Sequence, residues 1–343
     1  MTPRHFALRH GASLLRICGA LALVALLALA CMAAITQMPS RSFRGPLPVA
    51  SADQAALAQR LRQHVVAVAS VEHNLRQPAA LDAAAHYLEA ELASYGYRVE
   101  RQEFEASRQK VRNLWVMLPS QRAPGQRVIV VGAHYDSAHE TAGANDNGTG
   151  TAAVLELARR LKDLGETASS DIVFALYTNE EPPYFKTHLM GSRVHAKALK
   201  AAGTPVQAML SLETMGYFSD EAASQKYPWP LNRFYPTQGD FIAFVGTTSD
   251  LRLVRSAVKS FRSHAQFPSE GIAAPRFIPG VDYSDHAAFI DEGHPALMVT
   301  DTAPYRYPHY HTREDTPDKV DYDRLARVVQ GLEGVIRDLA TQP

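Results

Sequence analysis

Five short segments of this chain carry acidic and histidine side chains in the order that a two-metal hydrolase needs. Each offers an imidazole nitrogen or a carboxylate oxygen, and both are zinc ligands in proteins. One such segment is a weak signal, but five in one chain indicate a shared site. The segments are His134-Tyr135-Asp136-Ser137, Gly143-Ala144-Asn145-Asp146-Asn147-Gly148, Asn179-Glu180-Glu181, Ser211-Leu212-Glu213-Thr214 and His309-Tyr310-His311-Thr312.

Apolar runs that predict β-strands precede most of these segments. The runs are residues 128–132 before His134, residues 172–177 before Glu180 and residues 208–212 before Glu213. A run with helical spacing at residues 148–164 follows the glycine-rich segment. Open α/β sheets bind ligands at the carboxyl ends of their strands, so we expect these polar residues to meet at one edge of a sheet.

Helical and strand patterns alternate along the rest of the chain. This alternation predicts an α/β fold, with a mainly parallel mixed sheet covered by helices on both faces. A stretch rich in proline and aromatic residues, 220–239, predicts an irregular insertion near the mouth of the site. Further helices are expected over residues 51–70, 78–95, 190–200, 251–261 and 322–339, and further strands over residues 97–104, 113–118 and 296–300.

The first two segments each have a functional and a structural interpretation. His134 and Asp136 are two residues apart, so both point the same way from an extended backbone. His134 is either a metal ligand whose imidazole Asp136 orients, or a hydrogen-bonded histidine at a strand end. Asp146 either bridges two metal ions or caps the following helix.

The other three segments leave similar alternatives. Glu180 and Glu181 are adjacent like charges, which need a cation or a proton nearby unless they lie in a solvated turn before Pro182. In the functional interpretation one of the two binds metal and the other acts as a base. Glu213 needs a partner if it is buried. His311 is either a ligand or a surface-loop histidine.

The balance of charges argues against a nucleic-acid partner. The 343 residues include 35 Lys and Arg and 35 Asp and Glu, so the formal charge is zero, and no basic stripe is present. A hydrophobic content of 46% supports one large α/β domain over residues 51–343. Both cysteines, Cys18 and Cys31, precede this domain, so it has neither a thiol nucleophile nor a disulfide.

The N-terminal region predicts a membrane anchor. Residues 17–35 carry no charge, and a helix of that length spans about 29 Å, close to the thickness of a bilayer's hydrocarbon core. Three arginines precede it, which favours a cytoplasmic tail over residues 1–16. We expect a transmembrane signal anchor over 17–36, a linker over 37–50 and the large domain outside the cytoplasm, periplasmic in a bacterium. Cleavage near Ala28-Leu29-Ala30 would instead release a secreted protein.

The order of these motifs resembles the M28 family of zinc peptidases, which includes aminopeptidases, glutamate carboxypeptidases and, as relatives, glutaminyl cyclases. The pattern is His-x-Asp, Gly-x-Asn-Asp-Asn-x-x-Gly, Glu-Glu, an acid and a final His. The resemblance covers most of residues 80–340. Met190-Gly191-Ser192-Arg193, Ser284-Asp285-His286 and residues 311–317 add to it.

The resemblance implies a zinc-exopeptidase-like fold, two zinc ions and a role for each candidate residue. His134 and Glu213 would hold one zinc ion, Glu181 and His311 the other, and Asp146 would bridge them. Glu180 would be the general base and acid, and Asp136 would support His134. Glu213 departs from the pattern, because many members have Asp there. Tyr283 lies near the region of the tyrosine that stabilises the oxyanion in some members, but its offset from Ser284 differs and it is not assigned.

These expectations lead to a membrane-anchored zinc aminopeptidase that acts on peptides outside the cytoplasm. The alternatives are a single-zinc enzyme resembling glutaminyl cyclases, a metallocarboxypeptidase, and a non-catalytic binding module on the same fold. Recognition of a substrate's amine needs acidic partners, whereas its carboxylate needs Arg or Lys. Arg276, Arg306 and Arg313 are the arginines near the site in sequence. The sequence indicates neither an oligomeric state nor a preferred side chain.

Overall fold

The computed structural model describes residues 3–341 and, within the first helix, the side chains of residues 18–27 and 29–36. The chain divides into two compact units, Met1–Gln37 and Met38–Pro343. The first unit holds helix α1 (Pro3–Thr36), whose segment Cys18–Thr36 is long and apolar enough to cross a membrane. A signal sequence has the same properties, so this helix is weak evidence for an anchor. The side chains of the expected cytoplasmic tail, 1–16, lie outside the described residues.

The second unit is built on an eight-stranded sheet with the order β1-β2-β4-β3-β5-β8-β6-β7. Four of the seven strand pairings in the described residues are parallel, namely β3–β4, β3–β5, β5–β8 and β6–β7. The mainly parallel mixed sheet predicted from the sequence is therefore confirmed. The strands are β1 (Glu100–Ala106), β2 (Gln109–Leu118), β3 (Val128–His134), β4 (Asp171–Tyr177), β5 (Val206–Glu213), β6 (Ile242–Thr247), β7 (Ser269–Ala274) and β8 (Ala296–Thr300).

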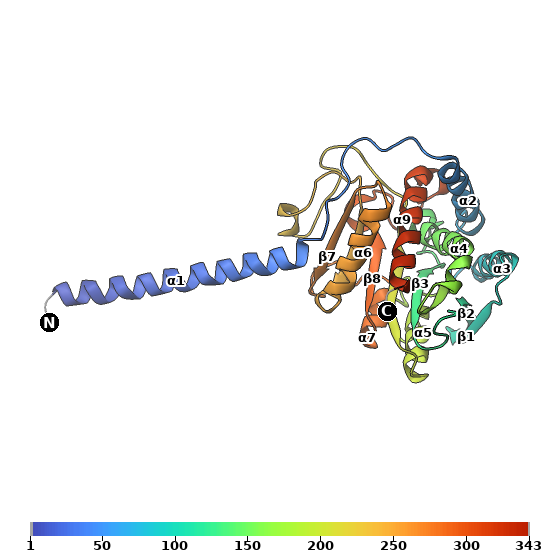
Figure 1. The fold of residues 1–343 in the computed structure, drawn as a ribbon, viewed down its shortest axis with the longest axis horizontal. Coiled ribbons are helices and arrows are strands. Elements are labelled where there is room, and N and C mark those ends of the chain that lie inside the picture. Colours follow the sequence, from blue (N-terminus) through green and yellow to red (C-terminus); the bar gives the residue numbers. More distant parts are fainter. Residues whose placement is uncertain (1–2, 342–343) are drawn as a thin grey trace. The chain divides into compact units, whose positions relative to one another are not determined.

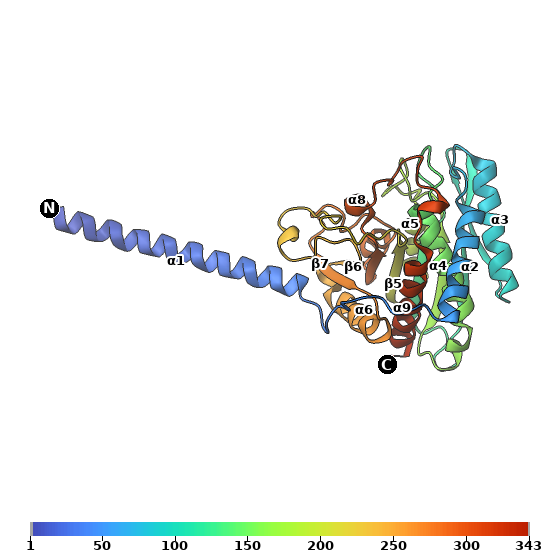
Figure 2. The same cartoon turned by 90° about the horizontal axis from the view of Figure 1, so that it is seen from above.

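Helices cover both faces of this sheet (Figures 1 and 2). Successive side chains of a strand point to opposite faces, and in β3 both sets are buried, which explains its uninterrupted apolar sequence. Ile129 and Val131 join the larger core, whereas Val128 and Val130 join the smaller one. The larger core includes α2 (Ala52–Val68), α3 (Pro78–Ser94), α4 (Gly150–Arg160), α6 (Leu251–His264) and α9 (Tyr322–Thr341), and the smaller one includes α5 (Gly191–Ala201) and α7 (His286–Asp291).

Local sequence signals define several helix ends. Ser51 precedes α2 and forms a capping box with Gln54, in which each side chain bonds the other residue's backbone N–H. Pro78 is the first residue of α3, where its missing N–H breaks no helical hydrogen bond. The predicted helices and strands fall at these elements to within a few residues.

Strands β6 and β7 and helix α7 were not predicted from the sequence. Each is six residues long, and the two strands contain a glycine that interrupts the apolar pattern. A Cβ atom on Gly246 would lie 2.6 Å from Val254, and one on Gly271 would lie 2.8 Å from Val258. The glycines therefore let α6 pack closely on this part of the sheet. The segment 220–239 is irregular apart from a short 3-10 turn at Leu231–Arg233, as expected.

Candidate active site

The polar segments meet at the carboxyl edge of the parallel strands. His134 is the last residue of β3 and Glu213 the last residue of β5. Glu180 and Glu181 follow the end of β4, whose Tyr177 is paired with His134. Asp146 lies in the turn that connects β3 to α4. The topology of the sheet thus gathers side chains that are up to 79 positions apart in the sequence, from His134 to Glu213.

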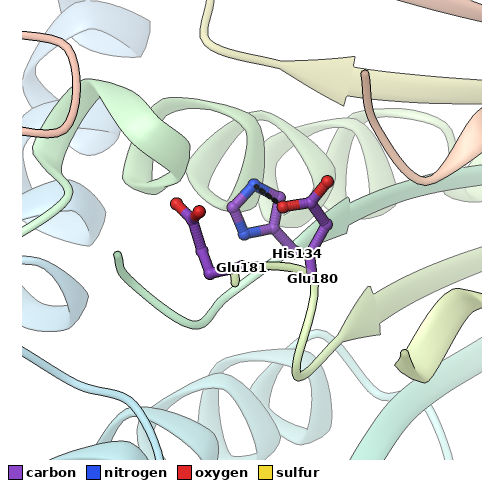
Figure 3. A group of neighbouring side chains, drawn as sticks. All are labelled: His134, Glu180 and Glu181. Carbon is purple, nitrogen blue, oxygen red and sulfur yellow. Dashed lines mark ion pairs between the residues drawn. The ribbon is translucent and has the colours of Figure 1, made fainter. Parts of the chain in front are cut away.

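A first cluster surrounds the buried imidazole of His134. Its Nε2 atom lies 3.4 Å from Oδ1 of Asp146 and 3.3 Å from Oε2 of Glu213. The same nitrogen lies 3.8 Å from Oε2 of Glu180, the pair joined by the dashed line in Figure 3. Ligand atoms of His134, Asp146 and Glu213 all lie within 4.8 Å of one another, so these three side chains can surround one metal ion.

A second cluster shares Asp146 with the first. Nε2 of His311 lies 3.0 Å from Oδ2 of Asp146 and 3.2 Å from Oε2 of Glu181. Asp146 therefore directs one carboxylate oxygen to each histidine. Ligand atoms of Asp146, Glu181 and His311 again lie within 4.8 Å of one another, as do those of His134, Glu180 and Glu181. The five residues expected to bind metal are thus brought together in two sets joined by one carboxylate.

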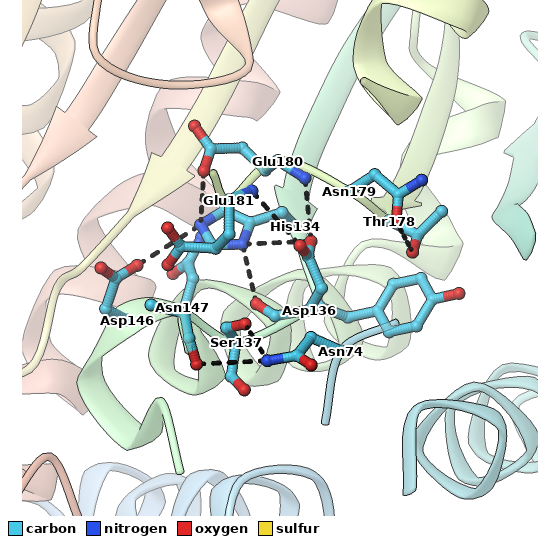
Figure 4. A network of polar contacts seen from close by, with 12 residues as sticks. Asn74, His134, Asp136, Ser137, Asp146, Asn147, Thr178, Asn179, Glu180 and Glu181 are labelled. Atoms are coloured by element: carbon cyan, nitrogen blue, oxygen red, sulfur yellow. Dashed lines mark hydrogen bonds and ion pairs between the residues drawn. The ribbon is translucent and has the colours of Figure 1, made fainter. Parts of the chain in front are cut away.

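Asp136 contacts both the imidazole of His134 and the backbone of the two adjacent glutamates (Figure 4). Its Oδ1 atom accepts the backbone N–H of Glu180 at 3.0 Å, and its Oδ2 atom accepts that of Glu181 at 3.2 Å. The Nδ1 atom of His134 lies 3.6 Å from Oδ1 of Asp136 and 3.1 Å from the backbone oxygen of the same residue. Asp136 is therefore placed to orient both the imidazole and the Glu180–Glu181 turn.

The electrostatics of the two clusters favour a bound cation. Burial raises the pKa of Glu181 to about 7 and that of Glu213 to about 8, and it raises the pKa of Glu180 well above its usual range. Burial opposes a charge on His311, but its contacts with Asp146 and Glu181 raise its pKa to about 11. Several buried carboxylates thus compete for two imidazoles, and divalent cations relieve such crowding.

Three of the buried side-chain atoms that have no hydrogen bond belong to these clusters, which fits metal binding. Nε2 of His134, Oδ2 of Asp146 and Oε1 of Glu181 are buried and have no hydrogen-bond partner among the described residues. Buried polar atoms are otherwise nearly always hydrogen-bonded. Imidazole nitrogen with carboxylate oxygens is a donor set that suits zinc. The residues present therefore fit this metal.

Asp315 and Asn147 shape the turn that carries Asp146, and sequence reasoning gave them no role. Oδ1 of Asp315 accepts the backbone N–H of Asn145 at 2.8 Å, and its Oδ2 accepts that of Asp146 at 3.1 Å. Oδ1 of Asn147 accepts the backbone N–H groups of Gly150 and Thr214. Asn147 lies in the motif at residues 143–148 and Asp315 in the segment 311–317. These motifs drew attention to both residues but did not predict their hydrogen bonds.

Ser284 supports Glu213, the residue that departs from the family pattern. Its hydroxyl donates to Oε2 of Glu213 at 2.6 Å, and its oxygen lies 2.8 Å from the hydroxyl oxygen of Ser211. All three side chains are buried. The hydroxyl pair therefore fixes a carboxylate whose extra methylene would otherwise leave it freer to rotate.

An apolar cavity opens beside Glu213, and Tyr310 lines it. The ring of Tyr310 stacks on His311 at a centroid distance of 3.9 Å. Burial raises the pKa of Tyr310, and the charges of Asp146 and Glu181 add to this effect, so the phenol keeps its proton. Tyr283 lies at the same cavity but is 45% exposed. Sequence reasoning gave no role to Tyr310, although its position next to His311 was an available signal.

The three arginines near the site in sequence are engaged elsewhere. Arg276 pairs with Asp282 and Asp291. Arg306 is buried and donates to Gln225 and to backbone oxygens, and Arg313 pairs with Glu140 at the surface. None of the three lines the cavity among the described residues.

A family model described as Peptidase family M28 matches residues 113–335. This chain belongs to peptidase family M28. Over 261 residues the M28 chain is 37% identical to the uncharacterized protein YfbL of Escherichia coli, covering 74% of this chain and 78% of that protein. It is 27% identical over 233 residues to a probable leucine aminopeptidase of Arthroderma otae, covering 63% of this chain and 55% of that protein. The match thus spans about half the length of the fungal relative.

Solved structures share the fold of this M28 chain. A zinc aminopeptidase from Bacillus subtilis has a TM-score of 0.63 and 14% identity, covering 83% of this chain and 95% of that one. A glutaminyl cyclase from Fimbriiglobus ruber has a TM-score of 0.58 and 19% identity. The match covers 90% of this chain and 100% of that chain. The zinc-exopeptidase-like fold is confirmed. Aminopeptidases and glutaminyl cyclases share this fold, so the fold alone does not determine the reaction. The residues of the site determine it.

Proposed function

We propose that this chain is a two-zinc aminopeptidase. The observation that carries the proposal is the shared carboxylate of Asp146, which lies 3.4 Å from the imidazole of His134 and 3.0 Å from that of His311. One zinc ion would be held by His134, Asp146 and Glu213, and the other by Asp146, Glu181 and His311. When bound, the two ions lower the pKa of a shared water and polarise the scissile carbonyl.

Glu180 is the proposed general base and acid. It lies at the edge of the first cluster and belongs to neither of the two sets that share Asp146. Its carboxylate takes the proton of the attacking water and passes it to the leaving amine nitrogen. Its buried surroundings raise its pKa, which suits a group that must both accept and return a proton. Asp136 is the proposed positioning residue, because it holds the backbone of Glu180 in place.

Tyr310 is the proposed donor to the substrate's carbonyl oxygen. Its phenol lines the cavity beside Glu213 and stays protonated because of burial and the nearby carboxylates. A positioned O–H group stabilises the negative charge that develops on this oxygen during attack.

The cavity favours a substrate's amino end over its carboxyl end. The acid Glu213 lines it beside the other proposed metal ligands, and no Lys or Arg is present among the described residues that line it. A free amine finds carboxylate partners here, whereas a terminal carboxylate lacks the cationic partner that it needs. This asymmetry supports an aminopeptidase over the metallocarboxypeptidase alternative.

The remaining alternatives predict different behaviour. A single-zinc glutaminyl cyclase has no need of a second set of ligands, yet His134, Asp146 and Glu213 form one. A non-catalytic binding module has no need of a base, yet Glu180 is present beside His134. These observations support the hydrolase over both.

One experiment on the full chain, purified in mild detergent, separates these functions. Metal analysis should give about two zinc ions per chain, and peptides with a free amine should be cleaved while N-acetylated ones are not. Amidation of the substrate's carboxyl end should have little effect. One zinc ion with cyclisation of N-terminal glutamine would establish the cyclase. Dependence on a free carboxyl end would establish a carboxypeptidase, and a metal-loaded chain without any reaction would establish a binding module.

We also propose that α1 anchors the chain in a membrane with residues 50–343 outside the cytoplasm. The uncharged segment Cys18–Thr36 and the three arginines before it in the sequence support this arrangement. A C-terminal reporter that works only outside the cytoplasm should be active, and one that works only inside should be silent. The opposite result would reverse the topology. A mature chain that begins after residue 30 would show that the segment is a cleaved signal sequence.

A further inference from the structure

The floor of the apolar cavity is one face of the sheet, with a carboxylate at each end. Glu213 of β5 is paired with Thr300 of β8, Thr300 with Ala243 of β6, and Ala243 with Glu270 of β7. Residues paired across neighbouring strands point to the same face. All four residues line the cavity. Three strand spacings of about 4.8 Å place the Cα atoms of Glu213 and Glu270 roughly 14 Å apart.

The cavity between the two acids is apolar. The adjacent row of paired residues, Met298, Val245 and Ile272, also lines it. Such a surface accepts a chain of methylene groups but leaves a charged end without a partner, unless a group of opposite charge lies at the far end.

Glu270 lies at that far end with two stacked tyrosines, and we call Tyr227, Tyr235 and Glu270 the distal pocket. The two rings lie 5.7 Å apart with an interplanar angle of 25°. Their hydroxyls are already used, because Tyr227 donates to Pro236 at 2.6 Å and Tyr235 to Gly271 at 2.8 Å. Burial raises the pKa of both phenols, and the charge of Glu270 adds to the effect. Aromatic rings beside a carboxylate form a typical environment for a cation.

The carboxylate of Glu270 has room for such a partner. Its side chain is 23% exposed, and no hydrogen bond to it is seen among the described residues. Nη2 of Arg262 lies 3.8 Å away, but that atom donates to the backbone oxygen of Ser269 at 2.6 Å. Burial raises the pKa of Glu270, while Arg262 and Arg44 oppose that effect. Arg262 thus lies beside Glu270 without forming a direct hydrogen bond to it.

We infer that the distal pocket selects peptides whose N-terminal residue is lysine or arginine. This inference rests on the proposed function, since the reacting bond must lie at the metal ligands near Glu213. A long aliphatic stem would lie along the apolar floor, and its cationic end would reach Glu270 beside the two tyrosine rings. Shorter side chains end before the distal pocket, and apolar ones leave Glu270 with only its 3.8 Å contact to Arg262.

The test compares charged substrates with uncharged ones of similar length. Dipeptides begin with lysine or norleucine, or with arginine or citrulline, and kcat/KM is measured for the full chain in detergent. A hydrogen bond to a charged group corresponds to about a 10- to 100-fold preference for lysine over norleucine and for arginine over citrulline. Glu270→Gln should remove this preference and leave kcat/KM for norleucine within about twofold of the unmodified chain. Glu270→Lys should reverse the preference.

Controls separate failure of this inference from failure of the proposed function. Glu103→Gln changes an exposed glutamate of β1 and should keep the preference. Cleavage of norleucine peptides by Glu270→Gln shows that this variant is folded and active. An equal rate for lysine and norleucine, or a preference that survives Glu270→Gln, overturns the inference while the aminopeptidase stands. Absence of cleavage of every substrate by the unmodified chain overturns the proposed function instead.

Discussion

Ser284 donates a 2.6 Å hydrogen bond to Glu213, the candidate ligand at the end of β5. Both side chains are buried, and the second carboxylate contact of Glu213 is with Nε2 of His134 at 3.3 Å. A glutamate has one more rotatable bond than an aspartate, so its carboxylate needs this support to keep one orientation. The relationship explains how the longer acid can serve in a cluster where many family members have aspartate.

Removal of this hydroxyl should weaken one metal site. In Ser284→Ala we expect metal affinity at the His134 cluster to fall by about 10- to 100-fold, the usual effect of removing a hydrogen bond to a ligand. Zinc content after graded exposure to a chelator measures the effect. Ser263→Ala, whose hydroxyl bonds only a carbonyl within α6, is the matched control. Unchanged resistance to the chelator in Ser284→Ala would contradict the role of this bond.

The adjacent glutamates should separate into two roles. Glu180→Gln keeps the size of the side chain but removes the base, so kcat should fall by at least about 10²-fold while both metal ions stay bound. Glu181→Gln should weaken or empty the His311 site, because a neutral amide is a poorer zinc ligand than a carboxylate. Metal content and kcat are measured for both variants.

The opposite pattern has a clear meaning. Loss of metal in Glu180→Gln with retention in Glu181→Gln would exchange the two roles. Full activity in both variants would show that neither residue takes part in the chemistry.

The sequence predicts that these candidate ligands lie at strand ends, because buried parallel strands are easily recognised. His134 and Glu213 each end a continuous apolar run, and the carboxyl ends of parallel strands must meet at one edge. The same reasoning places Glu180 after β4. These placements depend on patterns among neighbouring residues, which can be read directly from the sequence.

The contacts that support the ligands depend on distant pairs and escape such reasoning. Ser284 reaches Glu213 across 71 positions, and Asp315 reaches Asn145 across 170. Glu270 belongs to β7, a strand that sequence patterns missed because Gly271 interrupts its short apolar run. Local periodicity does not indicate which strands are neighbours in the sheet. The contacts of these residues are therefore known only from the folded structure.

Asp136 should act on the site through the backbone. Its two oxygens accept the N–H groups of Glu180 and Glu181, and Asp136→Asn replaces one acceptor with a donor. We expect kcat to fall by at least about tenfold and the metal-free chain to lose roughly 1–3 kcal/mol of stability, because one buried N–H loses its partner. Asp323→Asn, at an exposed position of α9, is the control. A variant with normal stability and kcat would show that the turn holds its shape without Asp136.

His195 should make the stability of the fold depend on pH. This histidine belongs to α5, on the side of the sheet away from α4 and α9. It is buried beside Tyr177, whose hydroxyl oxygen lies 3.1 Å from its Nδ1 atom, and burial lowers its pKa to about 4. An unfolded chain takes up this proton near its ordinary pKa of 6.5, whereas the folded chain does not until about pH 4. Protonation therefore favours unfolding across this range, and the free energy of unfolding should decrease as pH falls from 6.5 to 4.

The contribution of this one histidine is at most on the order of 3 kcal/mol over the full range. In His195→Gln that part of the slope should disappear, so the difference in stability between the variant and the unmodified chain should shift in favour of the variant as pH falls. Urea unfolding of the chelator-treated chain at several pH values between 4 and 7 measures the two slopes without interference from metal release. His86→Gln, at an exposed position of α3, should keep the original slope. Parallel curves for His195→Gln and the unmodified chain would show that His195 is protonated equally in the folded and unfolded states.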